Sequence, residues 1–193
     1  GVSMAALLLA EAAVVLYWAT VGRALASVRP AIHVTACVAG LAALLAQAVG
    51  VAADWGTATV AMTFGTCLSS AAFLAGACTA MILGHWYLVI PSLQIGHLQS
   101  IVRLHIASMV VRIAVVIAAI AVAVAVWQPG TVPSFGRYVF SVGGVFFWQR
   151  VLFGLAGPLV LSYLTWETAK IRSTQSATGI LYVDFFTVVV GEA

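Results

Sequence analysis

Charged residues are the scarcest feature of this sequence. Only 7% of its 193 residues are Asp, Glu, Lys or Arg, whereas 64% are hydrophobic and the mean hydropathy is +1.15. A soluble domain has about 25% charged residues. The composition therefore argues against a water-soluble domain and predicts an integral membrane protein surrounded by a lipid bilayer. Since no run of basic residues is present, we expect no nucleic-acid partner.

The sequence also lacks the motifs of several enzyme classes. It contains no HExxH, GxSxG, Walker A, CxxC or CxxCH pattern. Lys170 is its only lysine and lies in a loop, so a retinal Schiff base inside a span is not expected. We predict no catalytic residue from these patterns. The cysteines Cys37, Cys67 and Cys78 fall inside apolar segments, and we interpret them as packing residues.

What the sequence does contain is a series of long apolar runs. A membrane-spanning helix needs about 20 apolar residues, whereas the strands of a membrane barrel would alternate in polarity. We therefore predict an all-α integral membrane protein, with one transmembrane domain over residues 1–193 that forms a polytopic bundle of about six helices. The predicted spans are residues 1–22, 31–53, 57–89, 92–127, 138–164 and 177–193. The sequence starts at Gly1 and stops just after an apolar run, so we expect it to be a fragment of a longer chain.

Basic residues are concentrated in alternate loops. The loops after the first, third and fifth predicted spans contain or adjoin five of them: Arg23, Arg29, Arg103, Lys170 and Arg172. The positive-inside rule places such loops in the cytoplasm. We therefore predict a multi-pass protein of the bacterial inner membrane whose N-terminus faces the periplasm.

Three of the four histidines lie in the stretch LGHWYLVIPSLQIGHLQSIVRLH, residues 83–105. Pro91 is predicted to separate the third span from the fourth, because the residue before a proline avoids helical conformation. His85 and His97 each lie six residues from Pro91, so they would sit at equal depth on neighbouring helices. Two neutral imidazoles at one depth suit the iron of a b-type haem. Arg103 would then be available to a haem propionate.

Besides the haem ligated by His85 and His97, a metal site and a purely structural role stay open for these histidines. His33 lies near the start of the second span, in the same predicted layer. It is an alternative haem ligand, or the third member of a tri-histidine metal site with His85 and His97. In the third interpretation, the HWY triplet at 85–87 belongs to the aromatic belt of the membrane surface and binds nothing.

A polar stripe follows Pro91. Its members are three or four residues apart, as on one face of a helix: Gln94, His97, Ile101, His105, Ser108 and Arg112. His105 lies about 12 Å from His97 along such a helix, too far to share one iron. We expect His105 to hydrogen-bond a quinone carbonyl, to relay a proton, or simply to bond a backbone carbonyl.

Charged residues inside the spans require partners. Glu11, Arg112 and Arg150 fall well within apolar runs, and an arginine at the midplane costs about 2.5–3.5 kcal/mol even on a lenient scale. We expect an ion pair of Glu11 with Arg150 or with Arg112. Gln149 and Arg150, together with His105 and Arg112, are predicted to line a polar pocket that reaches the middle of the membrane.

These residues suit three functions. The first is a membrane subunit of a bacterial electron-transfer complex, which binds haem b or quinone near the cytoplasmic side and needs other membrane or peripheral redox subunits as partners. The second is a proton- or ion-conducting or transport subunit, with the charged residues inside the spans as its gate. The third is a structural scaffold subunit of a larger membrane assembly, whose histidines only hydrogen-bond.

Overall fold

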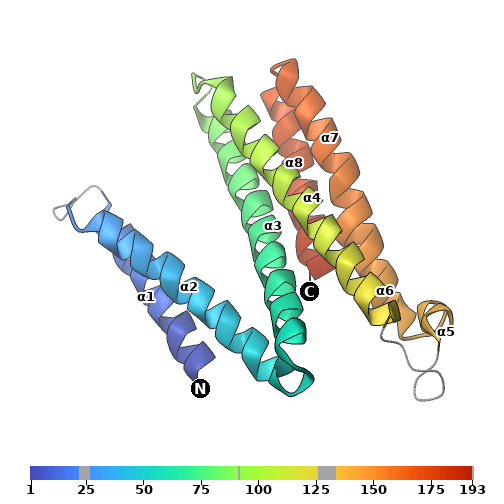
Figure 1. The fold of residues 1–193 in the computed structure, drawn as a ribbon. Coiled ribbons are helices and arrows are strands. Elements are labelled where there is room, and N and C mark those ends of the chain that lie inside the picture. The colour runs from blue at the N-terminus through green and yellow to red at the C-terminus, as the bar shows by residue number, and fades with distance from the viewer. Residues whose placement is uncertain (22–26, 91, 126–133, 193) are drawn as a thin grey trace. The chain divides into compact units, whose positions relative to one another are not determined.

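The computed structural model describes residues 1–21, 27–90, 92–125 and 134–192, and every regular element in them is helical (Figure 1). Two residues used in the predictions lie outside the described residues. They are Pro91, which is predicted to separate the third span from the fourth, and Arg23, one of the basic loop residues behind the predicted orientation. The long helices are α1 (Val2–Thr20), α2 (Arg29–Ala52), α3 (Thr57–Val89), α4 (Ile95–Ala125), α7 (Gly157–Lys170) and α8 (Thr174–Glu192). Shorter elements are a 3-10 turn (Ala53–Trp55), α5 (Phe135–Val139), α6 (Gly144–Val151) and a π-helical segment (Leu152–Ala156).

The chain forms two compact units, Gly1–Leu68 and Ser69–Ala193. In the first unit, α1 and α2 pair as a helical hairpin in which the Ser3 hydroxyl donates to the carbonyl of Ala43 at 3.3 Å. Small residues, Ala39 and Ala43 among them, form the buried side of α2 and allow the two backbones to approach closely. The prediction of a single transmembrane domain stays a prediction.

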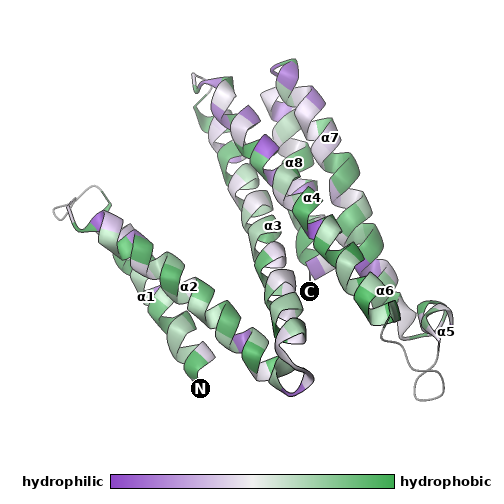
Figure 2. Ribbon diagram, viewed as in Figure 1, coloured by the Kyte–Doolittle hydropathy of each residue, from purple (hydrophilic) through white to green (hydrophobic). Residues whose placement is uncertain are grey.

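Five helical stretches of the described chain are long enough and apolar enough to cross a membrane: Val2–Thr20, Arg29–Trp55, Thr57–Val89, Ile95–Ala125 and Gly144–Lys170. Only 6–33% of the most apolar window of each stretch is buried, and the long green stretches in Figure 2 show how apolar these helices are. A soluble protein would bury such surface. The prediction of an all-α chain is therefore confirmed for the described residues, and these five stretches are consistent with the predicted helical membrane bundle. The sixth predicted span folds as α8, which is not among these five stretches and contains Asp184 and Glu192.

The fifth predicted span is irregular because of its glycines and proline. Pro158 has no N–H to donate within a helix, and the backbone just before it widens into the π-helical segment. There Gly154 meets Gly191 of α8 so closely that a Cβ added to Gly191 would lie 2.1 Å from the Cα of Gly154. The Gln149 amide donates to the carbonyl of Val190 at 2.7 Å, beside this crossing. The two glycines therefore let the end of α8 pack directly against the π-helical backbone.

We predict that Gly191→Ala destabilises the second unit. The added methyl has no room without separating the two backbones, and overpacking of this kind costs about 1–3 kcal/mol. Denaturant unfolding of the detergent-solubilised protein, followed by circular dichroism, measures the change. Gly179→Ala is the matched control on the same helix, because a Cβ there meets nothing within 4 Å. Equal stability of the two variants would contradict the proposed close contact.

Candidate functional site: buried acid–base pairs between α4 and α8

The second unit buries a histidine against an aspartate. His105 of α4 and Asp184 of α8 are both 0% exposed, and 2.7 Å separates Nε2 of the imidazole from Oδ2 of the carboxylate. Phe73 of α3 stacks on the imidazole, with ring centroids 5.3 Å apart and planes within 1° of parallel. The phenyl ring therefore shields one face of the histidine, while the aspartate fixes its edge.

A second pair lies further along the same two helices. The Arg112 guanidinium, on a residue only 8% exposed, donates from Nε and Nη2 to the two carboxylate oxygens of Glu192 at 2.8 and 2.7 Å. Its Nη1 donates to the hydroxyl of Ser69 at 3.3 Å, and Ser70 donates to Glu192. This bidentate geometry matches the fork of the guanidinium to the carboxylate and is the strong form of such a contact.

The register of the two helices brings both pairs together. His105 and Arg112 are seven residues apart on α4, and Asp184 and Glu192 are eight apart on α8. Each interval is close to two helical turns, about 11–12 Å. Helices α4 and α8 run in the same direction (Figure 1). The later base, Arg112, therefore meets the later acid, Glu192, just as His105 meets Asp184. The site is therefore a column of two acid–base pairs, which we call the polar column.

Apolar layers alternate with the two pairs. Leu98 and Val102 of α4 pack with Leu181 of α8 before the histidine level. Met109 of α4 and Val188 of α8 pack with Phe73 between the histidine and arginine levels. All of these side chains are essentially buried. In this conformation the apolar layer of Phe73, Met109 and Val188 separates the two polar levels from each other.

Two polar atoms of the histidine level have no hydrogen-bond partner among the described residues. These are Nδ1 of His105 and Oδ1 of Asp184, and both are fully buried. A Cβ added at Gly76 of α3 would lie 3.1 Å from both Nδ1 of His105 and the hydroxyl of Ser108, so the glycine leaves this side of the imidazole uncrowded. Buried polar atoms of this kind are costly unless water or a moving proton reaches them. Nδ1 of His105 and Oδ1 of Asp184 are therefore the two atoms of this level that a further hydrogen bond could still satisfy.

Only some members of the predicted polar stripe face the interior of the second unit. The buried side of α4 consists of Leu98, Val102, His105, Met109 and Arg112, so His105 and Arg112 face inward as expected. His97 is exposed, because a separation of eight residues turns it about 80° from His105 around the helix. Gln94 precedes the first turn of α4 and is exposed as well.

The other predicted haem or metal ligands lie on exposed faces. His85 is exposed on α3, and its Nδ1 is 3.0 Å from the hydroxyl of Tyr182. His33 is exposed on α2 in the first unit, where it contacts Cys37 and the ring of Tyr17. Within the described residues, no three His, Cys, Asp or Glu side chains form a group that could hold a metal ion. The haem pair of His85 and His97 and the tri-histidine site stay predictions.

The remaining predicted polar residues are dispersed. Arg103 is exposed, 6.0 Å from the ring centre of Trp166, and Gln149 bonds the backbone of α8. Arg150 is exposed in the second unit and Glu11 in the first, so an ion pair between them stays a prediction. Arg112, the alternative partner suggested for Glu11, is held by Glu192.

Sequence reasoning missed the two acidic partners, Asp184 and Glu192. A usable signal was present, because the interval of eight residues between them nearly equals the interval of seven between His105 and Arg112. Two acids and two bases at matching intervals on two apolar segments indicate helices that pair in the same direction. The run around Asp184 was predicted only as the sixth span, and neither acidic residue was given a partner.

We predict strong energetic coupling between Arg112 and Glu192. Arg112→Leu or Glu192→Leu alone leaves one buried charge without its partner and costs about 3–5 kcal/mol of unfolding free energy. The double variant Arg112→Leu/Glu192→Leu is expected to cost less than the two single variants added together. The exposed pair of Lys170 and Glu167, 2.7 Å apart, is the control and should couple by less than about 1 kcal/mol. Additive effects at Arg112 and Glu192 would show that the pair is not buried together.

No protein-family model, no curated protein and no solved structure matches this chain. What the chain does must therefore be inferred from the chemistry of its own residues. The feature that most demands a function is the polar column, since it places four ionisable side chains inside an apolar helical bundle.

Proposed function

We propose that this chain is a proton-conducting or proton-coupled transport subunit of a membrane assembly. The observation that carries the proposal is the polar column: the fully buried pair of His105 with Asp184, and the pair of the buried Arg112 with the partly buried Glu192, at successive levels of α4 and α8. Ionisable groups inside membrane helices are costly and mark ion or proton pathways more often than structural contacts.

The histidine level is the proposed proton-binding station. With one proton between Nε2 of His105 and Oδ2 of Asp184, 2.7 Å apart, and none on Nδ1, the pair is a neutral imidazole beside a carboxylate and has one net negative charge. A second proton, added at Nδ1 of His105, makes the pair neutral overall, either as imidazolium with carboxylate or as imidazole with carboxylic acid. The pair therefore exchanges a proton without any change of fold, provided that water reaches Nδ1.

The arginine level is the proposed barrier to other cations. A guanidinium keeps its charge at any physiological pH, so the bidentate pair of Arg112 and Glu192 presents fixed charges rather than a proton-exchange site. The hydroxyls of Ser69 and Ser70 hydrogen-bond to this pair, so the hydrogen-bond network extends from the pair to α3. The intervening layer of Met109 and Val188 must open to water before a proton moves between the levels, which makes this layer the gate.

The charge distribution of the loops supports an orientation for this subunit. With the basic loops in the cytoplasm, the N-terminus faces the periplasm of a bacterial inner membrane. The turn between α7 and α8, with Lys170 and Arg172, is then cytoplasmic. The histidine level lies nearer to this side than the arginine level does.

A second candidate is the electron-transfer subunit that binds haem b or quinone. The specific observation in its favour is the contact between Nδ1 of His85 and Tyr182, which leaves Nε2 of an exposed imidazole available. Metal-binding histidines commonly have such a partner on their other ring nitrogen. His85 and His97 would hold the iron, the haem would supply one-electron chemistry, and partner redox subunits would supply the electrons.

We predict that Asp184→Asn lowers proton flux at least about tenfold, because an amide cannot exchange the proton with His105. Purified protein in liposomes loaded with a pH-sensitive dye, under a potassium-diffusion potential, measures the flux. His97→Gln is the matched control, since it removes an exposed imidazole from the same helix as His105. Circular dichroism and size-exclusion profiles verify that both variants fold. Undiminished flux through folded Asp184→Asn protein, or no flux through the unmodified protein, would contradict the proposal.

The second candidate predicts a haem spectrum. A dithionite-reduced minus air-oxidised spectrum of the purified protein should show the α-band of a b-type haem, and His85→Ala or His97→Ala should abolish it. His33→Ala tests the alternative ligand. A flat spectrum from fully assembled material, with no extractable quinone, would remove this candidate and leave the proton-flux measurement unaffected.

A further inference from the structure

Two adjoining pockets lie at one end of the second unit, where α3 and α7 end and α4 and α8 begin. The first has a volume of about 510 Å³ and the second about 420 Å³. They share two residues, Tyr87 and Thr174. Each volume falls within the roughly 300–1,000 Å³ of small-molecule sites. Because they meet at shared walls, they can hold one extended ligand.

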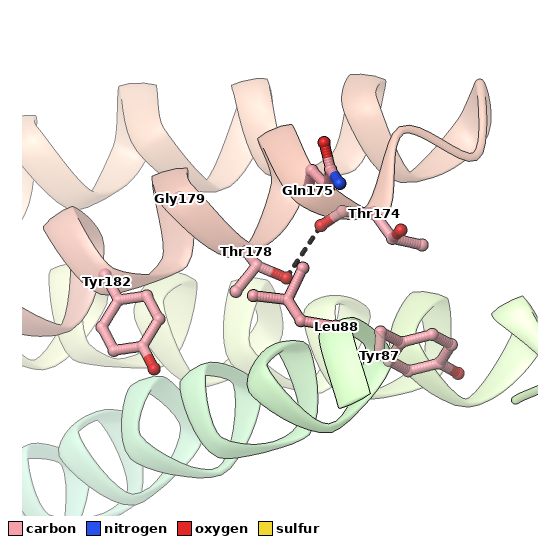
Figure 3. A pocket seen from close by; sticks show the side chains of 7 residues that line it. All are labelled: Tyr87, Leu88, Thr174, Gln175, Thr178, Gly179 and Tyr182. Carbon is pink, nitrogen blue, oxygen red and sulfur yellow. Dashed lines mark hydrogen bonds between the residues drawn. The ribbon is translucent and has the colours of Figure 1, made fainter. Parts of the chain in front are cut away.

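The first pocket is the apolar half. It lies between α3 and α8, where Leu88 and Gly179 face it and Tyr182 closes one end (Figure 3). The hydroxyl of Thr178 is used within the protein: it lies 2.8 Å from the carbonyl of Thr174 on its own helix (Figure 3) and 2.8 Å from the carbonyl of Gly84 on α3. A Cβ added at Gly179 would meet nothing within 4 Å, so the floor of this pocket is open. Hydrocarbon is the ligand chemistry that fits here.

The second pocket is the polar half. Gln94 and Arg172 contribute side chains to it, and among the described residues no acidic one lines either pocket. Arg172 is exposed, and its side chain has no hydrogen bond, ion pair or ring contact among the described residues. Lys170 and Arg103, the other cations that the described part of the second unit has near this end, are engaged: Lys170 with Glu167 at 2.7 Å and Arg103 with the Trp166 ring. Arg172 is therefore the cation that this end offers to an anion.

We propose that the two pockets form one binding site for an anionic phospholipid. The phosphate would lie on Arg172 with the Gln94 amide beside it, and an acyl chain would pass Tyr87 to lie along Leu88 and Gly179. The site is at the end of the membrane helices, where lipid headgroups are found, and basic pockets between helices are typical anionic-lipid sites. A free phosphate would fill only the polar half. This inference is independent of the proposed proton pathway.

Native mass spectrometry of the detergent-purified protein tests it. Dioleoyl phosphatidylglycerol and dioleoyl phosphatidylcholine are titrated separately. We expect one tightly bound phosphatidylglycerol, with about tenfold lower affinity in Arg172→Gln, because a charge-assisted contact to the phosphate is lost. Gly179→Leu should weaken both lipids by filling the apolar half.

Two variants are matched controls. Arg103→Gln removes an exposed cation near the same end but outside both pockets, and Gly65→Leu fills open space elsewhere on α3. Neither should alter lipid binding. Equal affinity for the two lipids, or an equal loss in Arg172→Gln and Arg103→Gln, would overturn the proposal. Displacement of phosphatidylglycerol by millimolar inorganic phosphate would show that the site recognises a free anion rather than a lipid.

Discussion

The contact between α4 and α8 is governed by the cost of burying charge. Each carboxylate and each base in the polar column is stable in an apolar bundle only when its partner is in place. The two pairs therefore restrict the register of these helices much more strictly than apolar side chains would. A shift of one residue turns a helix by about 100° and would separate both pairs at once. Leucine and valine surfaces tolerate such slips, and lipid does not oppose them.

Other features of the second unit follow from this requirement. Apart from Phe73, which stacks on the imidazole, helix α3 approaches the column with the small residues Ser69, Ser70 and Gly76, which leave space for the imidazole edge and the guanidinium. The end of α8 must reach Arg112, and its approach depends on the crossing of Gly191 with Gly154. The π-helical segment, the glycine crossing and the arginine pair are thus parts of one arrangement at the end of α8.

The sequence was informative about elements and less so about sites. Continuous apolar runs bounded by polar loops locate the long helices well: α3 spans Thr57–Val89, as predicted. Inward and outward faces were harder to assign, because in a membrane both faces of a helix are apolar. Polarity alone grouped His97 with His105, although only His105 is buried. The acidic partners of His105 and Arg112 lie some 80 residues away in the chain, and apart from their matching spacing nothing in the sequence indicates them.

The energetics of buried ion pairs bear on why the column is present. Replacing a buried pair with well-packed apolar residues is often neutral or even stabilising, so stability alone gives no reason to keep both pairs. The bidentate arginine pair can be explained as a device that fixes helix register. The histidine pair is different, because it leaves Nδ1 of His105 and Oδ1 of Asp184 without partners. A contact selected only for register would satisfy these atoms or omit them. A proton-exchanging contact needs them free for the moment when water enters, and this asymmetry between the two levels favours proton exchange at His105 over a purely structural role.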